Sequence, residues 1–456
     1  MLTQNSVSFH DRTNAGQALE VLNDHLHVCE PPIAPYSEAR IKITAGSDMK
    51  KLAYKTMAMK SSEASEILDD RIDDFMHLIQ AHHNLEDSAF GSAASQSISE
   101  VVSVGRIASD SPEGKLNASS LVLETSRRMG AGLRIPLDMG NVSFQFFPGQ
   151  IVALRGINAS GDKFTVSEIL DVPLLGSAAS TSAGLEEHIN RLRGGTDAME
   201  TDSGLAPLSV LLGSGPYTTD DNLDFEPLHA LCSQAADIYA DALILNGPFL
   251  DVDHPLIASG DFDLPEEAMA EPDTITMSTV FKYLISPAFQ HLVAANPKIT
   301  IILVPSVKDA LSNHTAWPQQ AFPRQDLSLP KGVKIVGNPM TLALNEIVVG
   351  ISSQDILSEL RYEEVTGRKG KEEAMFARLP KYLIEQRHFF PLFPPMDRRS
   401  LPKAGTEEGI PAGAMLDTSY LKLGEMLNAR PDMLITPSAL PPFARVCSHL
   451  LGTYCC

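Results

Sequence analysis

The sequence predicts a multidomain α+β protein in which a small β-barrel precedes a larger α/β domain. Three observations support this fold class. Short β-rich runs separated by turn residues fill residues 100–175, and strand-like runs alternate with helical patterns after residue 205. The chain has 456 residues, of which 43% are hydrophobic, so it is long enough to build more than one buried core.

The charge and cysteine content exclude several classes of protein. The formal net charge is −21, which speaks against autonomous, non-specific DNA binding because an acidic surface repels phosphates. The 5 cysteines are scattered and form no CxxC pair, so we expect a reducing compartment and no structural zinc site. The N-terminus lacks the pattern of a signal peptide, and no apolar run is long enough to span a membrane.

The first 80 residues divide into an arm and a helix. Residues 1–50 are polar and interrupted by prolines, which predicts an extended N-terminal arm or linker. Apolar residues recur at helical spacing over residues 62–80, which predicts an amphipathic helix capped by Ser62. Three histidines follow at steps of five and six residues, which do not share a helix face; we interpret them as a solvated helix end rather than a metal site: His77, His82 and His83.

Residues 51–175 are expected to form the barrel domain, led by this helix. The strand-like runs are VVSVGRIA, SSLVLET, LRIPLDM, QIVALRGIN and KFTVSEIL, and they occupy the range from residue 101 to residue 170. Turn residues such as Pro148-Gly149 separate them. A small barrel of about five short strands is typical of the OB-fold, so we predict an OB domain here.

An OB domain that binds single-stranded DNA needs aromatic side chains along a basic groove. The candidate strands offer four phenylalanines, which we expect in the core or at a docking surface: Phe144, Phe146, Phe147 and Phe164. The basic residues are few: Arg106, Lys115, Arg127, Arg128, Arg134, Arg155 and Lys163. This number does not indicate a strongly basic groove.

Residues 176–204 are rich in Ser, Gly, Ala and Thr, which predicts a flexible loop or linker. Residues 205–456 then alternate strands with helices, for example at 227–239 and 276–294, which predicts a mainly parallel central sheet. The expected strands are Leu208–Leu212, Ala242–Leu245, Thr300–Val304, Lys334–Val336, Glu346–Ile351 and Asp432–Ile435.

The most informative segment is GPFLDVDHP, from Gly247 to Pro255, which directly follows an expected strand. The carboxyl ends of parallel strands are where α/β domains bind ligands. A two-metal phosphoesterase would need GDxxD here, but this chain has Gly247-Pro248. The other expected motifs DxH, GNH and GHxH are also missing. We therefore predict no catalytic, metal-binding or cofactor-binding residues, although the turns of such a scaffold remain.

Several residues of the second domain stay as weaker candidates. His254 and His314 are candidates for vestigial chemistry, and Arg368–Lys371 is a candidate nuclear signal or mobile loop. Four basic residues are interpreted as partner contacts or exposed charge: Lys308, Arg324, Arg398 and Arg399. Four aromatic residues suit either a protein interface or the core, and the sequence leaves both open: Tyr217, Phe249, Trp317 and Phe322.

A series of motifs in order along nearly the whole chain carries a resemblance to a known family. They are FHDRTN, VGRI, FPGQIVALRGIN, SGPYTTDDN, GPFLDVDHP, LVPSVKDALSNHTAWPQQAF, FFPLFPP and PDMLITPSAL. Together they resemble the B subunits of the DNA polymerase α–primase complex, in a fungal-like version. GPYTT and GPFLD separate the chain from the related B subunits of polymerases δ and ε.

This resemblance implies an OB-fold joined to a calcineurin-like phosphoesterase domain, here residues 205–456, that is catalytically inactive. It implies a non-catalytic scaffold subunit that binds the zinc-bearing C-terminal domain of the polymerase α catalytic subunit. Such a subunit supports replication initiation and primer synthesis in the nucleus, without a cofactor or a membrane. Primase subunits would be partners through the complex, and DNA only indirectly or weakly. The alternatives are an active metallophosphoesterase or nuclease, and a single-strand DNA-binding module.

Two departures from the family pattern concern the ends of the chain. The family carries an N-terminal helical domain before the arm, and this chain starts inside the expected linker. The family also continues with further strands around an Asn-Pro-Gly-Arg run, whereas this chain ends in VCSHLLGTYCC. We therefore expect an incomplete C-terminus and a sheet with an unpaired edge, which would reduce stability.

Overall fold

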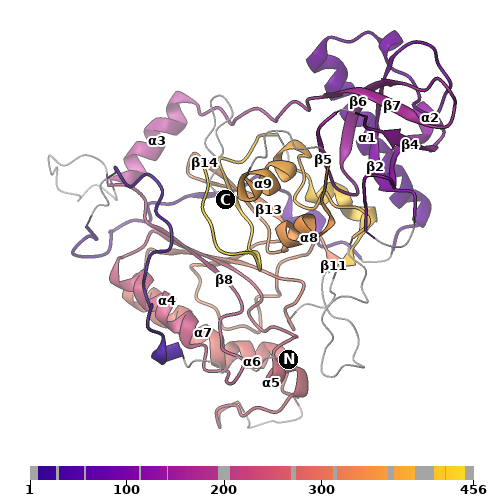
Figure 1. Ribbon diagram of the computed structural model, residues 1–456. Coiled ribbons are helices and arrows are strands. Elements are labelled where there is room, and N and C mark those ends of the chain that lie inside the picture. Colours follow the sequence, from indigo (N-terminus) through magenta and orange to yellow (C-terminus); the bar gives the residue numbers. More distant parts are fainter. Residues whose placement is uncertain are drawn as a thin grey trace.

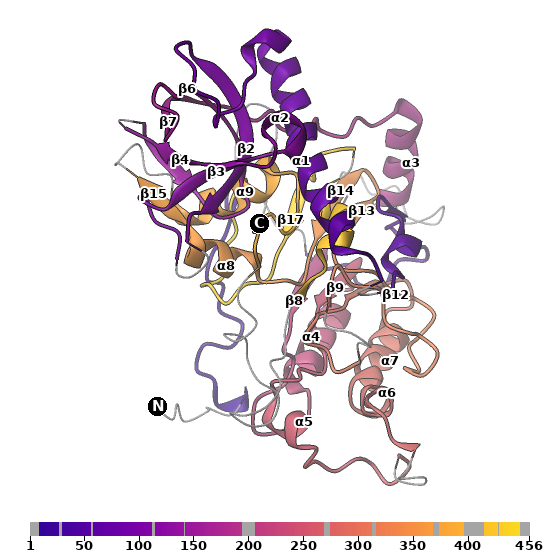
Figure 2. The same cartoon turned by 90° about the vertical axis from the view of Figure 1, so that its right-hand side faces the viewer.

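The computed structural model places the barrel at one end of the molecule and a group of helices at the other (Figure 1). Described segments of the last third of the chain lie between them, among them α8 (Ile356–Glu363) and α9 (Met375–Glu385), as the turned view in Figure 2 also shows. The structure describes residues 9–26, 30–55, 58–111, 115–140, 142–193, 206–268, 274–311, 316–367, 374–395, 415–426 and 428–446. Within these ranges, no helix combines the length and apolar character needed to cross a bilayer.

The five predicted barrel strands are all present and close on themselves in the order β2-β3-β4-β7-β6. They are β2 (Val101–Ser109), β3 (Leu121–Thr125), β4 (Arg134–Asp138), β6 (Ile151–Ile157) and β7 (Phe164–Leu170). Alternate residues of each strand point inward, as the two-residue period of a strand requires, and Ile107, Leu123 and Leu154 are fully buried there. The prediction of a small closed barrel is confirmed.

Helix α1 (Ser61–His83) packs across the barrel. Ile72, Phe75 and Ile79 are buried against residues of β2 and β6, as the helical spacing predicted. The prediction of a cap by Ser62 is wrong, because the helix begins at Ser61. Its first turn is closed by the Glu63 carboxylate, which accepts a hydrogen bond from the Lys60 amide at 2.8 Å.

The expected extended arm enters the second domain instead of staying outside it. Strand β1 (Ile43–Ala45) pairs antiparallel with β13 (Met340–Leu344), and Ile41 is buried in the same core. Arg40 is 3% exposed and forms an ion pair with Asp241 at 2.9 Å. The sequence offers little sign of this contact, because the strand has only three residues and its partner lies about three hundred positions away.

Four parallel strands form one sheet of the second domain, in the order β12-β10-β9-β8. They are β8 (Val210–Ser214), β9 (Ala242–Asn246), β10 (Thr300–Val304) and β12 (Val333–Ile335). Strand β9 is buried along its whole length. Leu243 and Leu245 face the core under the helices, while Ala242 and Ile244 face the opposite core.

The prediction of one central sheet is wrong, because a second sheet packs against the first. Its order is β1-β13-β14-β17, with β14 (Ile347–Ile351) and β17 (Met433–Ile435). Asn345, with a φ of 55°, forms the tight turn between β13 and β14 and so makes an antiparallel hairpin. Both sheets contribute to one apolar layer that includes Ile302 and Leu342, so the domain is a sandwich.

Helices cover the outer face of the parallel sheet, chiefly α4 (Glu226–Asp237) and α7 (Ser286–Ala295). The long helix predicted at 276–294 is interrupted. It consists of α6 (Met277–Val280), a π-turn at Phe281–Ile285 and then α7. Pro287 cannot donate a backbone hydrogen bond, which accounts for an irregular turn just before it.

The predicted loop at 176–204 contains helix α3 (Ser182–Leu192). Thr181 caps this helix by accepting a hydrogen bond from the Gly184 amide at 3.1 Å. Small residues dominate the composition of this segment and so favour a linker, but Thr181 and the run Leu185–Leu192 form a capped helix. Residues 194–204 lie outside the part of the chain that the structure describes.

The remaining helices and strands lie within one domain or between the two. Helix α2 (Arg127–Gly130) belongs to the barrel, and α5 (Pro255–Ser259) follows β9 in the second domain. The others are β5 (Phe144–Phe146), β11 (Ala316–Trp317), α8 (Ile356–Glu363), β15 (Val365–Gly367), α9 (Met375–Glu385), β16 (Met415–Leu416) and the 3₁₀ segment η7 (Thr418–Gly424). Strand β5 leaves the barrel and pairs antiparallel with β15 of the second domain. Helix α1 contacts η7 of the second domain as well as the barrel.

Candidate functional site

The carboxyl ends of the parallel strands meet at one edge, where the sequence predicted a degenerate site. The turns after β8, β9 and β10 lie there, and Asn338 follows β12. The isolated bridge between Asp251 and Asp309 brings the turn after β9 next to the turn after β10. We call this region the strand-end edge.

Asp309 is the central residue of the strand-end edge. It is 2% exposed, and its carboxylate accepts backbone hydrogen bonds from Phe249, Leu250 and Ser306 at 2.5, 3.0 and 2.8 Å. Burial raises the pKa of Asp309 to about 7, against the lowering effect of the three amide donors. Asp309 thus holds two turns together and offers no free oxygen toward solvent.

Gly247 allows the turn after β9 to pack closely against the loop of Asp309. A Cβ atom added at Gly247 would collide with the Asp309 carboxylate and with Ser306. The turn can therefore approach the Asp309 loop only where residue 247 has no side chain. The Gly247-Pro248 turn, which stands where the sequence of a metal-ligand motif would be expected, thus packs closely against the loop after β10.

Asn338 follows β12 at the strand-end edge and is fully buried. Its Oδ1 accepts hydrogen bonds from Trp317 Nε1 at 3.3 Å and Ser352 Oγ at 3.1 Å, and its Nδ2 donates to Ser353 Oγ at 2.7 Å. Ser353 in turn donates to the carbonyl of Pro305 after β10. This polar network is internal and joins the ends of both sheets.

The acidic pair and the histidine of the GPFLDVDHP segment also have internal partners. Asp253 forms an ion pair with Lys308 at 2.9 Å. His254 caps α5 by accepting a hydrogen bond from the Leu256 amide at 3.2 Å, and its Nε2 lies 2.8 Å from the carbonyl of Thr219. Burial raises the pKa of Asp251. Among the residues that the structure describes, no three His, Cys, Asp or Glu side chains gather as a metal site.

The remaining candidates lie in a loop, in the core or outside the described residues. Arg324 donates to the carbonyls of Val333, Leu329 and Pro330 and so fixes its own loop. The four aromatic residues with an open assignment are all core residues, with exposed fractions of at most 5%: Tyr217, Phe249, Trp317 and Phe322. Four of the candidates fall outside the described residues: His314, Arg368–Lys371, Arg398 and Arg399.

The barrel shows no stacking platform for bases among the residues that the structure describes. Its four candidate phenylalanines, Phe144, Phe146, Phe147 and Phe164, are at most 6% exposed. Six of its seven basic residues are paired with a carboxylate: Arg106 and Arg134 with Glu124, Arg127 with Asp69, Arg128 with Asp73, Arg155 with Glu168 and Lys163 with Asp138. Lys115 lies 4.6 Å from the ring centre of Tyr362. Most of these positive charges are therefore neutralised within the chain.

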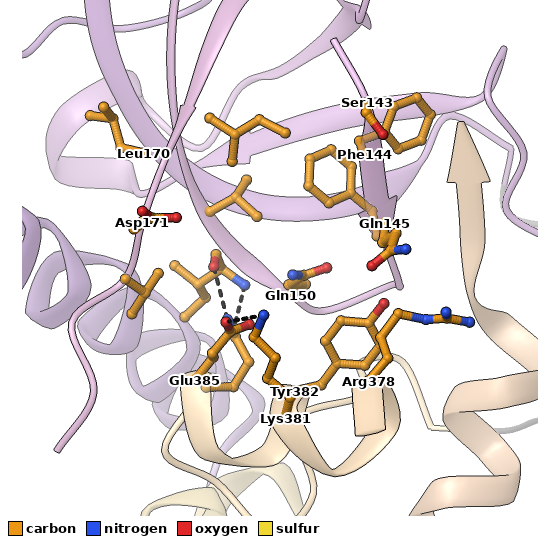
Figure 3. A pocket seen from close by; sticks show the side chains of 16 residues that line it. Ser143, Phe144, Gln145, Gln150, Leu170, Asp171, Arg378, Lys381, Tyr382 and Glu385 are labelled. Atoms are coloured by element: carbon orange, nitrogen blue, oxygen red, sulfur yellow. Dashed lines mark hydrogen bonds and ion pairs between the residues drawn. The ribbon is translucent and has the colours of Figure 1, made fainter. Parts of the chain in front are cut away.

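A cavity of about 350 Å³ lies between the barrel and helix α9 (Figure 3). The barrel side includes Phe144 and Leu170, and the α9 side presents Lys381, Tyr382 and Glu385. Lys381 and Glu385 lie 3.7 Å apart. The cavity thus joins an apolar wall to an ion pair at a boundary between two domains.

Beside this cavity, one side chain fastens the barrel to the second domain. Gln386 is 2% exposed; its Oε1 accepts from the Ile151 amide at 2.8 Å, and its Nε2 donates to the Ile151 carbonyl at 3.0 Å. Arg71 of α1, also buried, reaches Glu425 of the second domain at 3.4 Å. We call this contact region the barrel junction. Sequence reasoning missed Gln386, Arg71 and Asp309 because each acts on a segment distant in sequence.

Comparisons with known proteins agree with this architecture. Residues 210–445 match the family model for the B subunit of DNA polymerase alpha/epsilon, and residues 65–172 match the model for the OB domain of the DNA polymerase alpha B subunit. The class of protein is therefore a polymerase B subunit, in which an OB domain is followed by the domain that the alpha and epsilon B subunits share.

The curated relatives narrow this class. The chain is 37% identical to the DNA polymerase alpha B subunit of Schizosaccharomyces pombe, over 95% of this chain and 70% of the relative. It is also 37% identical to that of Saccharomyces cerevisiae, over 90% of this chain and 59% of the relative, and 26% identical to that of Bos taurus, over 96% and 65%. The chain belongs to the family of DNA polymerase alpha B subunits, so the resemblance seen in its motifs is confirmed. It spans between 59% and 70% of the length of these three relatives.

Proposed function

We propose that this chain is a non-catalytic scaffold subunit of DNA polymerase α–primase in the nucleus. It binds the C-terminal domain of the catalytic subunit and supports the initiation of replication and primer synthesis. It reaches the primase subunits through the complex and contacts DNA only indirectly or weakly. Its second domain is an inactivated phosphoesterase-like domain. The names of the relatives, all B subunits of DNA polymerase alpha, support this assignment.

The observation that carries the proposal is the closed hydrogen-bond network of the strand-end edge. Asp309 uses its carboxylate on three backbone amides, and Asn338 uses its amide on three neighbouring side chains. Hydrolysis by a two-metal centre needs carboxylates and histidines that point at a metal and at water. Here Asp253 and His254 are engaged by Lys308 and the α5 backbone. This edge therefore favours a structural role over catalysis.

The charge pattern of the barrel speaks against single-stranded DNA as its ligand. Free lysines and arginines next to exposed aromatics are the usual means of binding a single strand. In this barrel Arg106 and Arg134 share Glu124, and Phe164 is fully buried. The domain is thus built to hold its own fold and to fix its position on the second domain.

Co-purification tests the scaffold function directly. The full chain is expressed with the C-terminal domain of the polymerase α catalytic subunit, and the chain alone serves as the control. We expect one monodisperse complex with equal amounts of the two proteins by size exclusion and light scattering. Circular dichroism establishes that the chain alone is folded. A folded chain that elutes separately from the catalytic domain would contradict the proposal.

Two further measurements separate the alternative functions. Metal content and hydrolysis of bis(p-nitrophenyl) phosphate with added Mn²⁺ test for a phosphoesterase or nuclease, and we expect neither bound metal nor turnover. Fluorescence anisotropy with a labelled single-stranded oligonucleotide tests the DNA-binding alternative. Tight binding by the isolated chain that weakens steeply with salt would favour that alternative, because salt competes with lysine and arginine contacts to phosphate.

A further inference from the structure

A small cavity lies inside the barrel junction, where three parts of the chain meet. It has a volume of about 10 Å³ and is lined by ten residues. They come from α1, from β2 and the start of β6 in the barrel, and from residues 390–393 and η7 of the second domain. A space of this size holds one particle about as large as a water molecule. Its occupant therefore touches all three parts at once.

Among the described residues that line this cavity, two guanidinium groups are the only polar side chains. Arg71 comes from α1 and Arg106 from β2, and they are 7% and 6% exposed. The other lining residues are glycine, proline and aliphatic or aromatic residues, for example Leu68, Ile151 and Leu392. The cavity therefore offers side-chain hydrogen-bond donors but no side-chain acceptor.

Neither guanidinium group is saturated by its partners in the described part of the chain. Arg71 donates to Glu425 Oε1 and to the Gln386 carbonyl, both at 3.4 Å, which is well beyond the usual length of a charge-assisted hydrogen bond. Arg106 donates to Glu124. Because a guanidinium group carries five N–H donors, both groups have donors left for a further acceptor.

Charge repulsion gives a second reason for an acceptor between the two groups. Burial lowers the pKa of Arg71, and the positive charge of Arg106 lowers it further, whereas Glu425 and Asp74 raise it. A negative charge between two poorly solvated like charges relieves their repulsion. A water molecule brings no charge, and the lining side chains offer no acceptor for its protons. The surroundings therefore favour a small anion over water.

We propose that the cavity between Arg71 and Arg106 is a binding site for one monatomic anion, of which chloride is the common one in cells. The anion accepts hydrogen bonds from both guanidinium groups and so fastens α1 to β2 beside the second domain. The volume of the cavity excludes phosphate, sulfate and a partner's carboxylate, because their several atoms need more room. The site goes beyond the scaffold function and does not depend on it, since it involves this chain alone.

Anomalous X-ray scattering from crystals of the full chain tests the site directly. Sodium bromide replaces sodium chloride during crystallisation, because bromide has the same charge and is only slightly larger. We expect a bromine peak between the guanidinium groups of Arg71 and Arg106, and no such signal in crystals grown with chloride. This measurement needs no substitution, so it holds even where a variant does not fold.

Thermal unfolding with two matched variants tests the site in solution. Sodium chloride is compared with sodium gluconate at equal ionic strength, because gluconate is too large for the cavity. We expect chloride to raise the unfolding midpoint of the parent by about 2 °C, with saturation as for a single site. Arg106→Gln should lose this rise. Arg134→Gln should keep it, because Arg134 pairs with the same Glu124 but is 58% exposed at its side chain and does not line the cavity. Circular dichroism establishes that both variants are folded.

Three results would overturn the proposal. The first is an ordered peak in the cavity without a bromine signal, which would identify a water molecule. The second is bromine at the protein surface and none between Arg71 and Arg106, which would mean an adventitious ion only. The third is an unfolding midpoint that is the same in chloride and gluconate, or a chloride effect that Arg106→Gln and Arg134→Gln retain equally.

Discussion

The strand-end edge and the barrel junction each join segments that are distant in sequence, but through side chains of different chemistry. In each, one buried side chain holds backbone groups of a distant segment: Asp309 at the edge and Gln386 at the junction. Asp309 accepts hydrogen bonds from three amides, and burial raises the pKa of its carboxyl group to about 7. Gln386 accepts from one amide and donates to one carbonyl of Ile151, without a titratable group.

This contrast indicates where the stability of the molecule depends on pH. A carboxylate can satisfy several amides at once, but its burial is costly when it is charged. A carboxamide satisfies one donor and one acceptor at any pH. We therefore expect the α/β domain to respond to pH through its strand ends, and the barrel junction to be insensitive to pH.

The largest expected effect comes from removing the carboxylate of the strand-end edge. Asp309→Ala leaves the amides of Phe249, Leu250 and Ser306 buried without acceptors. Because each buried, unsatisfied amide costs on the order of 1–3 kcal/mol, we expect a loss of about 3–5 kcal/mol. Urea unfolding at constant pH measures this loss. A loss under about 1 kcal/mol would show that the edge relaxes or takes up water.

We expect a smaller loss of stability from a substitution at the barrel junction. Gln386→Ala removes both hydrogen bonds to Ile151, and we expect a loss of about 2–3 kcal/mol that is the same at pH 5 and pH 8. Gln290→Ala is the matched control, because Gln290 makes one exposed hydrogen bond to the Ser328 carbonyl. A loss that depends on pH at position 386 would mean that a titrating group takes part in the junction.

Glu359, near the same strand ends, allows the pH dependence to be isolated. It is 9% exposed and accepts a hydrogen bond from Gln354 at 2.8 Å; burial, with repulsion from Asp355 and Glu363, raises its pKa to about 7. A raised carboxyl pKa means that the folded chain holds the proton more tightly than the unfolded chain. Stability from this group is therefore present below about pH 4.5 and is lost as the pH rises toward 7.

Glu359→Gln keeps the acceptor for Gln354 and removes the titration. We expect the variant to be about 1–2 kcal/mol more stable than the parent at pH 8 and no more stable at pH 4. Thermal unfolding across this pH range measures the difference. A parallel offset of the two curves at every pH would show that Glu359 does not titrate between pH 4 and pH 8.

The smallest effect is expected at the surface of the barrel. Arg127 pairs with Asp69 of α1, but its side chain is 52% exposed to solvent. Exposed ion pairs contribute little because water and salt screen them. We expect Arg127→Gln to leave the unfolding midpoint within experimental error at physiological salt. A clear shift would mean that this pair helps to fix α1 on the barrel.

Local patterns predicted many elements of this fold but not the contacts between distant elements. The barrel strands and the four parallel strands were found because apolar residues alternate or cluster between clear turns. The sequence does not indicate β1 or the hairpin partner β13, and it therefore predicts one sheet where the structure has two. Their pairing depends on a contact between Ile43 and Leu344, which no local period encodes.

The strand-end edge could also be predicted only in part, because its contacts join residues far apart in the sequence. The absence of metal-ligand motifs at Gly247-Pro248 and at Asn338-Pro339 was visible in the sequence. What replaces the ligands was not visible, because Asp309 has no motif and acts on residues about sixty positions away. The role of Asp309 becomes visible only in the structure, where the turns after β9 and β10 lie next to each other.

The sequence by itself determined three things. Local patterns predicted the strands and turns, the composition gave the acidic net charge, and the ordered motifs indicated the family. These features depend on residues that are close together in the sequence or on residue counts, so no tertiary contact is needed to recognise them. Tertiary packing was needed to establish which buried groups satisfy one another: Arg40 with Asp241, Gln386 with Ile151 and Asp309 with three amides. It was also needed to place β8 at an edge, because strand order depends on contacts between segments far apart in the chain.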